Sequence, residues 1–368
     1  MTTPPCPCCD ECVPELAFCV RCGQPLDPAA VGHGFAAAPH ESRSLPHVVS
    51  TIFPQLPRAS MRVFRLVWLL AVAAVLIVGA MGMYPVAVVL SAVTVPTLLV
   101  VYLYDVDVYE RQPWLVLALT VCWGSAIGVL TAVTLRAVTG SALEPAGIGD
   151  ATTLETVTIP VLGFFLAVLG TVAILLPYRA FNDVLDGTTF GSVSASFASS
   201  SQVVVLALPL FSEGLRPAGD TGSWLLVLSE LAIAVPLLWA ALGATVAGSF
   251  WLRFRSAPAV RASIAHPGSP PAAIAVAVGM LACVALARLE LSRGLSLAVM
   301  LCLLLLALFH LRRLIHAGLV NEALEQPIGP EMDCANCGCA TPSHLFCGRC
   351  GMARRSLPKG VGGLPVTR

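Results

Sequence analysis

Long apolar segments separated by short polar ones dominate the chain between residues 63 and 315. The hydrocarbon core of a bilayer is roughly 30 Å thick, which a helix crosses in about 20 apolar residues. Eight segments reach or nearly reach this length: 63–83, 84–104, 113–137, 157–178, 189–211, 224–252, 271–289 and 294–315. The pattern predicts an all-α polytopic membrane protein with about eight transmembrane helices, within a membrane domain of residues 63–316.

The first two spans are separated only by Met83-Tyr84-Pro85. Proline in the first turn of a helix costs no hydrogen bond that would otherwise form, so this junction predicts a tight helical hairpin. Residues 1–62 contain no apolar stretch of signal-peptide length, and the first span is therefore expected to act as the membrane signal.

The arginines near the span ends predict the orientation. Eight spans place both termini on one side, and cytoplasmic loops carry the excess of Lys and Arg. Ten arginines fall on the side of the termini: Arg58, Arg62, Arg65, Arg111, Arg179, Arg253, Arg255, Arg261, Arg312 and Arg313. Four fall on the other side: Arg136, Arg216, Arg288 and Arg293. We therefore expect a multi-pass plasma-membrane protein with both termini in the cytoplasm.

The composition also supports a membrane protein, and its balanced charge does not favour nucleic acid as a partner. Of the 368 residues 57% are hydrophobic and 11% charged, and the mean hydropathy is +0.84; a soluble protein is about one quarter charged. Lys+Arg and Asp+Glu balance at 21 each, so no overall field favours nucleic acid. The expected partners are the lipid bilayer and other proteins in the membrane and cytoplasm.

Eleven of the 14 cysteines lie in the first 22 residues or after residue 333. They form an internal repeat, because Cys6-x2-Cys9-x9-Cys19-x2-Cys22 has the same spacing as Cys334-x2-Cys337-x9-Cys347-x2-Cys350. The same offset also aligns Pro14 with Pro342, Phe18 with Phe346, Arg21 with Arg349 and Gly23 with Gly351. The two ends of the chain therefore carry the same kind of module.

Four thiolates in this spacing are typical of a zinc ribbon, and a Gly after a cysteine pair accepts the positive φ of the knuckle. With all four positions filled by protein, each site is expected to be structural, which gives two zinc ions per chain. Cys8 and Cys12 leave a second register open at the N-terminus, Cys9-x2-Cys12 with Cys19-x2-Cys22, although the repeat favours Cys6 and Cys9. Disulfides are the alternative, disfavoured in a reducing cytoplasm.

The expected domains are an N-terminal zinc ribbon (1–25), a flexible linker (26–62), the membrane domain (63–316), a second linker (317–333), a C-terminal zinc ribbon (334–352) and a disordered tail (353–368). Each ribbon has apolar side chains that a neighbour can cover, Leu16 and Phe18 in one and Leu345 and Phe346 in the other. We predict that the ribbons dock into one cytoplasmic unit; two independent modules are the alternative.

Two stretches of the membrane domain carry a family resemblance. Tyr102-Leu-Tyr-Asp-Val-Asp-Val-Tyr-Glu-Arg-Gln-Pro-Trp114 and Phe181-Asn-Asp-Val-Leu-Asp-Gly-Thr-Thr-Phe-Gly191 resemble segments of PrsW-type intramembrane metalloproteases, over about residues 95–252. The resemblance implies a bacterial membrane protein that, where the motifs are intact, cleaves a membrane-anchored regulator such as an anti-sigma factor.

The catalytic positions that the resemblance implies are largely replaced. The family's Glu-Glu-x-x-Lys motif corresponds to a segment with Glu155 as its one carboxylate, Phe-x-x-x-Glu has Ser201 in place of the glutamate, and the helix that should supply histidine, Leu231–Gly243, has none. Serine and aliphatic side chains are poor ligands for a catalytic metal. We expect no catalytic residues, with Glu155 as a remnant candidate, and a scaffold or regulator as the function. An active metalloprotease is the rival hypothesis; a transporter is a third, for which no inverted repeat is visible.

Several polar positions inside the spans have more than one interpretation. Glu230 is a candidate functional carboxylate, either partly solvated or paired with an internal partner. Asp183 and Asp186 are expected to cap the fifth span, with Gly187 in a turn. The small, serine-rich run 191–201 predicts a buried central helix, or alternatively a polar groove for a substrate segment. The isolated cysteines Cys122, Cys283 and Cys302 are expected to be small buried apolar side chains.

Overall fold

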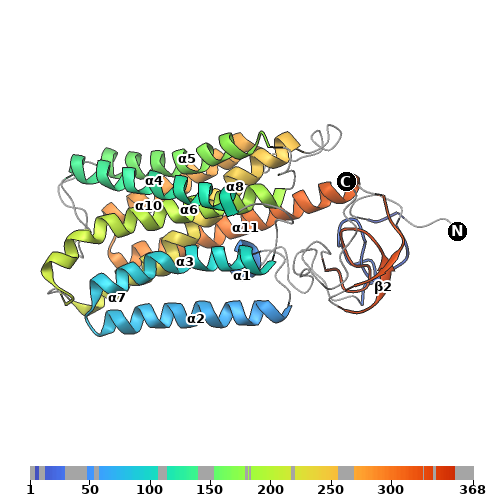
Figure 1. Cartoon of the computed structure of the whole chain (residues 1–368), viewed down its shortest axis with the longest axis horizontal. Coiled ribbons are helices and arrows are strands. Elements are labelled where there is room, and N and C mark those ends of the chain that lie inside the picture. The colour runs from blue at the N-terminus through green and yellow to red at the C-terminus, as the bar shows by residue number, and fades with distance from the viewer. Residues whose placement is uncertain are drawn as a thin grey trace.

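Helices run back and forth along one axis and form a bundle, with a small cysteine-rich unit at one end (Figure 1). This computed structural model describes residues 5–7, 13–29, 48–53, 58–106, 114–139, 153–178, 181, 184–216, 220–255, 269–325, 327–334 and 337–352. The helices of the bundle are α1 (Val48–Ile52), α2 (Arg58–Ala80), α3 (Tyr84–Val106), α4 (Trp114–Thr139), α5 (Thr153–Leu175), α6 (Val184–Ala207), η1 (Leu208–Glu213), α7 (Thr221–Ser229), η2 (Glu230–Ala234), α8 (Val235–Arg255), α10 (Pro270–Glu290) and α11 (Arg293–Glu325).

Within the described residues, seven helices are long and apolar enough to cross a membrane, rather than the expected eight. α7, η2 and α8 form one of them, Thr221–Phe254. The eighth expected span, 63–83, falls on α2, whose apolar part is described from Phe64 to Ala80.

The predicted hairpin is confirmed. α2 ends at Ala80 and α3 begins at Tyr84, and Gly82 adopts a φ of 78° in the turn between them. A positive φ is strained for residues with a Cβ, so glycine permits this short connection. Pro85 lies in the first turn of α3, where the missing N–H has no consequence.

Two helix boundaries differ from the expectation. α6 begins at Val184, so Asp186 lies inside its first turn and does not precede the helix as a cap; Asp183 lies outside the described residues. Gly187 is helical, and a Cβ there would overlap the Trp251 ring. α11 continues to Glu325, so the expected linker 317–333 is helical over about half its length. Hydropathy locates the membrane part of a helix and misses a polar continuation rich in Ala, Leu and Glu.

α6 is the predicted buried central helix. It approaches α8 so closely that a Cβ on Gly191 would overlap the Gly243 carbonyl. Its hydroxyls bind neighbouring helices, with Ser194 Oγ donating to the Ala167 carbonyl at 2.9 Å. Every residue of α6 from Val184 to Ser196 is buried, whereas 28% of the apolar window of α10 is buried. This arrangement is typical of membrane bundles, in which small residues allow helices to pack closely.

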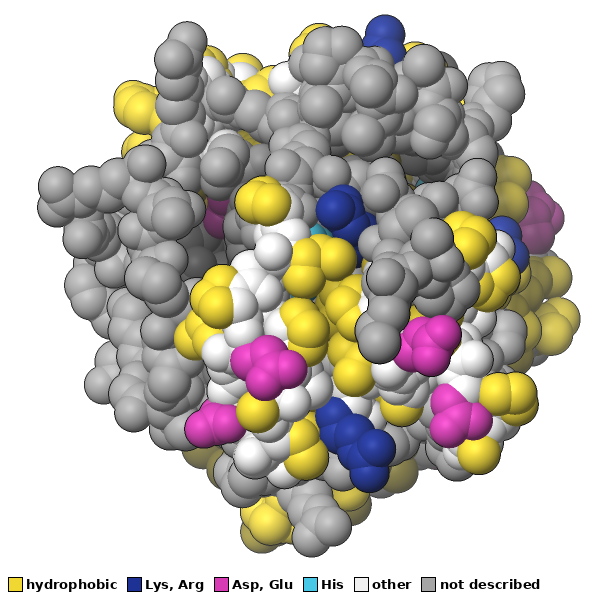
Figure 2. All heavy atoms as spheres, turned by 90° about the vertical axis from the view of Figure 1, so that its right-hand side faces the viewer, with side chains coloured by type: hydrophobic (Ala, Val, Ile, Leu, Met, Phe, Trp, Pro, Cys, Tyr) yellow, Lys and Arg dark blue, Asp and Glu magenta, His cyan; other side chains and the backbone are white. Residues whose placement is uncertain are grey.

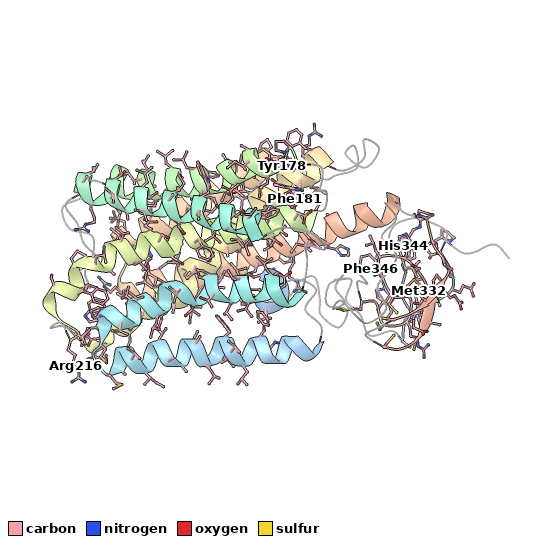
Figure 3. All side chains as sticks on the ribbon, in the orientation of Figure 1. Tyr178, Phe181, Arg216, Met332, His344 and Phe346 are labelled. Carbon is pink, nitrogen blue, oxygen red and sulfur yellow. The ribbon has the colours of Figure 1, made fainter. Side chains whose placement is uncertain are left out.

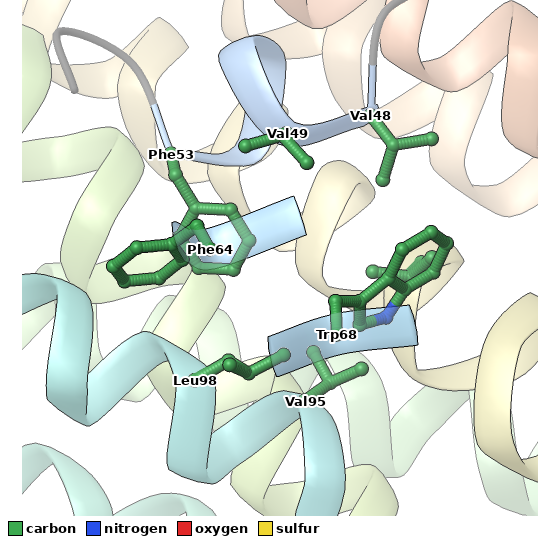
Figure 4. Close-up of a pocket in the computed structure, with 8 residues that line it drawn as sticks. Val48, Val49, Phe53, Phe64, Trp68, Val95 and Leu98 are labelled. Atoms are coloured by element: carbon green, nitrogen blue, oxygen red, sulfur yellow. The ribbon is translucent and has the colours of Figure 1, made fainter. Parts of the chain in front are cut away.

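The linker before the bundle is partly ordered. Of the expected flexible segment 26–62, residues 30–47 and 54–57 lie outside the described residues, whereas α1 is buried against the bundle. Val49 and Phe53 line an apolar pocket with Phe64 and Trp68 of α2 (Figure 4). The fully buried Arg312 of α11 donates to Thr51 Oγ1 of α1 at 3.1 Å. Apolar side chains of α1 are thus buried against the bundle, although the composition of the segment predicted a flexible linker.

Candidate metal centres

The C-terminal module (described residues 327–334 and 337–352) is built on a short antiparallel pair, β1 (Glu331–Asp333) and β2 (Ala340–Pro342). Each cysteine pair closes a knuckle in which a glycine amide donates back to the first cysteine carbonyl, Gly338 to Cys334 at 2.6 Å and Gly351 to Cys347 at 2.8 Å. These glycines have φ values of 70° and 71°, as the sequence predicted for Gly351. The knuckles bring the sulfur atoms of Cys334, Cys337, Cys347 and Cys350 within 4.8 Å of one another.

The N-terminal module (described residues 5–7 and 13–29) repeats the second knuckle. Gly23 has a φ of 68° and donates to the Cys19 carbonyl at 2.9 Å. The sulfur atoms of Cys6, Cys19 and Cys22 lie within 4.8 Å of one another. Cys9, expected as the fourth ligand, lies outside the described residues together with Cys8 and Cys12. The structure therefore brings together three of the four predicted ligands here and all four in the C-terminal module.

The sulfur separations match a tetrahedral metal site. With Zn–S bonds of about 2.3 Å, the edge of a tetrahedron is about 3.8 Å. The Sγ–Sγ distances are 3.6 Å for Cys6–Cys22, 3.9 Å for Cys334–Cys350 and 3.8 Å for Cys337–Cys347. A disulfide requires about 2.05 Å. The donor set and its geometry thus fit zinc, and these cysteines are not cross-linked.

Thiolate formation is distributed unevenly over the clusters. A hydrogen bond from the Cys350 thiol, with others from the backbone and Thr341, lowers the pKa of Cys347 to about 4. The Cys22 thiol is the main cause that lowers the pKa of Cys19 to about 5. Burial and the neighbouring Cys347 charge raise the pKa of Cys337 to about 12. The protein itself thus favours the thiolate form of Cys19 and Cys347 and disfavours that of Cys337.

The two modules contact each other, as predicted. The Phe18 amide donates to the Gly348 carbonyl at 2.9 Å, and the Phe346 amide donates to the Val20 carbonyl at 3.1 Å. Phe18 and Phe346 are buried, and Ile328 of the C-terminal module packs against the apolar core of the N-terminal one. Leu345 and Phe346 also belong to the apolar cluster that contains the helices, so the docked pair is joined to the bundle.

Two residues of this region were not predicted. The Thr341 hydroxyl lies 3.6 Å from Cys347 Sγ, and His344 Nδ1 lies 3.0 Å from the Val20 carbonyl oxygen. The repeat offers a weak signal for the second, because His344 is a polar residue where the other module has Leu16. Nothing in the sequence points to Thr341.

The carboxylate candidates in the membrane region lie apart from these clusters. Among the described residues, the only groups of three or more His, Cys, Asp or Glu with ligand atoms close together are the two cysteine clusters. Glu155 belongs to the first turn of α5, but its side chain lies outside the described residues. Ser201 lies in α6, where the family's glutamate was expected.

Glu230 has an internal partner. Its carboxylate forms an ion pair with Arg288 of α10, and the Glu230 and Arg288 side chains are 15% and 35% exposed. Glu230 begins the π-helical turn η2, in which the Val235 amide donates to the Glu230 carbonyl. π-helical turns occur often at functional sites, but this pairing fully accounts for the carboxylate as a link between two helices.

Comparisons of the chain with protein-family models, with curated proteins and with solved structures find no match. The function is therefore inferred from the residues and geometry of this chain.

Proposed function

We propose that the chain is a non-catalytic, PrsW-like scaffold or regulator of the plasma membrane, which holds two structural zinc ions in a cytoplasmic unit and binds other proteins. The observation that carries this proposal is the docking of two cysteine modules on one end of a tightly packed bundle, one with four sulfur atoms brought together and the other with three. Closed metal sites supply shape and not chemistry, which favours a binding role.

The ligand sets follow the repeat. Cys334, Cys337, Cys347 and Cys350 hold one zinc ion, and Cys6, Cys9, Cys19 and Cys22 hold the other. The position of Cys6 beside Cys19 and Cys22 supports this register over the one that uses Cys9 and Cys12.

The packing of the bundle centre supports a scaffold over a protease or transporter. Small residues allow α6 to pack closely against α8 and α4. A Cβ on Gly191 of α6 would overlap the Gly243 carbonyl, and a Cβ on Gly124 of α4 would overlap the Ser194 carbonyl. Three hydroxyls of α6 bind neighbouring helices, those of Ser192, Ser194 and Ser200, while Ser196 Oγ is buried without a hydrogen-bond partner. The pocket beside Thr188 and Ser192 has room for about one water molecule. A groove for an unwound substrate segment needs more space than this.

The docked modules also bear on membrane topology. Modules from the two ends of a chain meet only if the chain crosses the membrane an even number of times, which adds α2 to the seven long apolar helices. α2 runs along the bundle beside α3 (Figure 1). Arg216 lies at the bundle end opposite the modules, whereas Tyr178 and Phe181 lie at the module end (Figure 3). Because most arginines near span ends fall at the module end, we assign that end to the cytoplasm.

Reporters fused to both ends of the chain test this topology. A reporter active only in the cytosol is expected to be active at each end. Activity at one end alone would contradict an even number of crossings.

The face at the module end fits a protein partner. Its described side chains mix acidic, basic and apolar groups without a single dominant charge (Figure 2). Crosslinking in cells, followed by purification of the full chain, tests this role. We expect partners to be recovered with the native chain and with Cys339→Ser, which leaves the four-sulfur set intact, and to be lost with Cys347→Ser. Equal recovery with all three would contradict binding through the modules.

Metal stoichiometry separates the scaffold from the enzyme. The scaffold predicts two zinc ions per chain, both lost when the cluster cysteines are changed to serine. A third ion that survives those changes and disappears with Glu155→Gln would support the metalloprotease instead.

A further inference from the structure

The contact between the modules is reciprocal. Adding 328 to a residue number converts the first repeat into the second, so Phe18 corresponds to Phe346 and Val20 to Gly348. The bond from the Phe18 amide to the Gly348 carbonyl is therefore the counterpart of the bond from the Phe346 amide to the Val20 carbonyl. Exchanging the modules maps the contact onto itself, as in an isologous dimer.

The side-chain contacts follow the same symmetry. Leu16 packs against Gly348, where an added Cβ would overlap it. The corresponding pair is His344 with Val20, and His344 Nδ1 lies 3.0 Å from the Val20 carbonyl oxygen. The pseudo-twofold axis thus relates contacts made by different side chains, which shows that the backbone arrangement determines it.

The axis passes between two cysteines of different clusters. The two backbone hydrogen bonds flank Cys19 on one segment and Cys347 on the other. The two bonds therefore hold the backbone segments around Cys19 and Cys347 side by side. Each of these cysteines belongs to its own sulfur cluster, so the backbone that holds one cluster is bonded directly to the backbone that holds the other.

We propose that the two cysteine clusters form one cooperative metal-binding unit, in which zinc at either cluster orders the other. This inference rests on the proposed zinc sites. A module of about 20 residues depends on its metal to fold, because its apolar core is too small to stabilise it alone. A folded module presents the carbonyl and amide groups that its partner uses, and Ile328 of one module completes the core of the other. Metal binding at one cluster therefore lowers the free energy that is needed to order the second module.

Linkage makes the coupling equal in both directions. Coupling free energies between sites typically change affinity by about 5- to 150-fold. The zinc affinity of the C-terminal cluster is expected to fall by a factor in this range when the N-terminal cluster is disabled, and the N-terminal affinity by the same factor in the converse case.

Native mass spectrometry of the full chain in detergent, titrated with zinc, tests the proposal by counting chains with no, one and two ions. We expect few one-zinc chains in the native protein. Gly348→Val places a side chain where Leu16 packs and retains all cluster cysteines, so it should raise the one-zinc population. Combining it with Leu16→Ala removes as many carbons as the valine adds and should restore cooperativity. Gly279→Ala, at a position with open space, is the control.

The outcomes separate the two proposals. If two ions bind and the one-zinc population of the native chain equals that of independent sites, coupling is wrong while the zinc sites stand. If no zinc binds, both are wrong. Affinities measured with Cys6→Ser/Cys22→Ser and Cys334→Ser/Cys337→Ser give a second measurement, and unequal coupling factors would also overturn the proposal.

Discussion

The bundle and the terminal modules are held together in different ways. In the bundle, α6 and α8 pack closely at Gly191 and Gly243, which have no side chains; in each terminal module, cysteines from separate parts of the segment gather into a sulfur cluster. Lipid is as apolar as leucine, so helices in a membrane gain little from hiding apolar surface and depend on close packing. The modules lie beyond the end of the bundle and have too little apolar surface to fold on it alone. The bundle is thus sensitive to added volume, and the modules to loss of an ion.

Metal removal should separate the two regions most clearly. Chelation of zinc is expected to unfold both modules, because a module of this size has no fold without its metal, and to leave the helices intact. Limited proteolysis should then cleave near residues 13–29 and 337–352, while the helical circular dichroism signal changes little. Protection should return when zinc is added back. Modules that stay protected in excess chelator would contradict this prediction.

Acid should act on the modules next. The pKa values of Cys19 and Cys347 are lowered to about 5 and about 4 in the folded protein, from an ordinary value of 9.0. Their thiolates therefore contribute stability that is complete above about 9 and lost as the pH falls through the folded values. Because protons compete with zinc for these sulfur atoms, we expect zinc to be released as the pH falls, with the bundle unchanged. A chromophoric zinc indicator measures the release, and retention of both ions at pH 3 would contradict it.

Added volume should act on the bundle alone. Gly191→Leu forces a side chain against the Gly243 carbonyl, and overpacking typically costs about 1–3 kcal/mol. The unfolding temperature in detergent should fall while the zinc content stays at its native value. Gly279→Leu provides the comparison, since no atom lies within 4 Å of a Cβ there. Equal losses for the two variants would contradict the assigned packing.

Removal of one hydroxyl should have the smallest effect. Ser194→Ala deletes the bond to the Ala167 carbonyl, and interhelical hydrogen bonds of this kind average about 0.6 kcal/mol. The measurement is the same unfolding experiment, with Ser212→Ala, at an exposed site outside the α6–α8 contact, as the control. A loss above about 2 kcal/mol would show that Ser194 has a larger role than one hydrogen bond.

Periodic spacing and apolar length carried most of what the sequence could predict. The hairpin at Tyr84, the central position of α6 and the sulfur clusters follow from local features: a proline, small residues and cysteine pairs. The docking was predictable because the modules repeat one another and expose apolar side chains. Of the eight expected spans, seven are long apolar helices within the described residues, and the eighth falls on α2.

Contacts between distant segments could not be predicted from the sequence. The Glu230–Arg288 ion pair joins helices that no local pattern relates, and the sequence left pairing and solvation both open for Glu230. Cys122, Cys283 and Cys302 were expected to be buried, but all three are exposed on the bundle. A helix that is apolar all round does not reveal which face meets protein and which meets lipid.

The docking of the two ends also orders events in time. Cys19 leaves the ribosome early, whereas Cys347 follows only after every span has been made, and at about 5–20 residues per second this delay is roughly 16 to 66 s. Throughout that interval the first module has no partner and the chain has open ends. Closure of the contact makes a ring of the polypeptide that includes the whole bundle. It can form only after α11, the last described helix, has been synthesised, so docking is expected to follow the formation of the bundle.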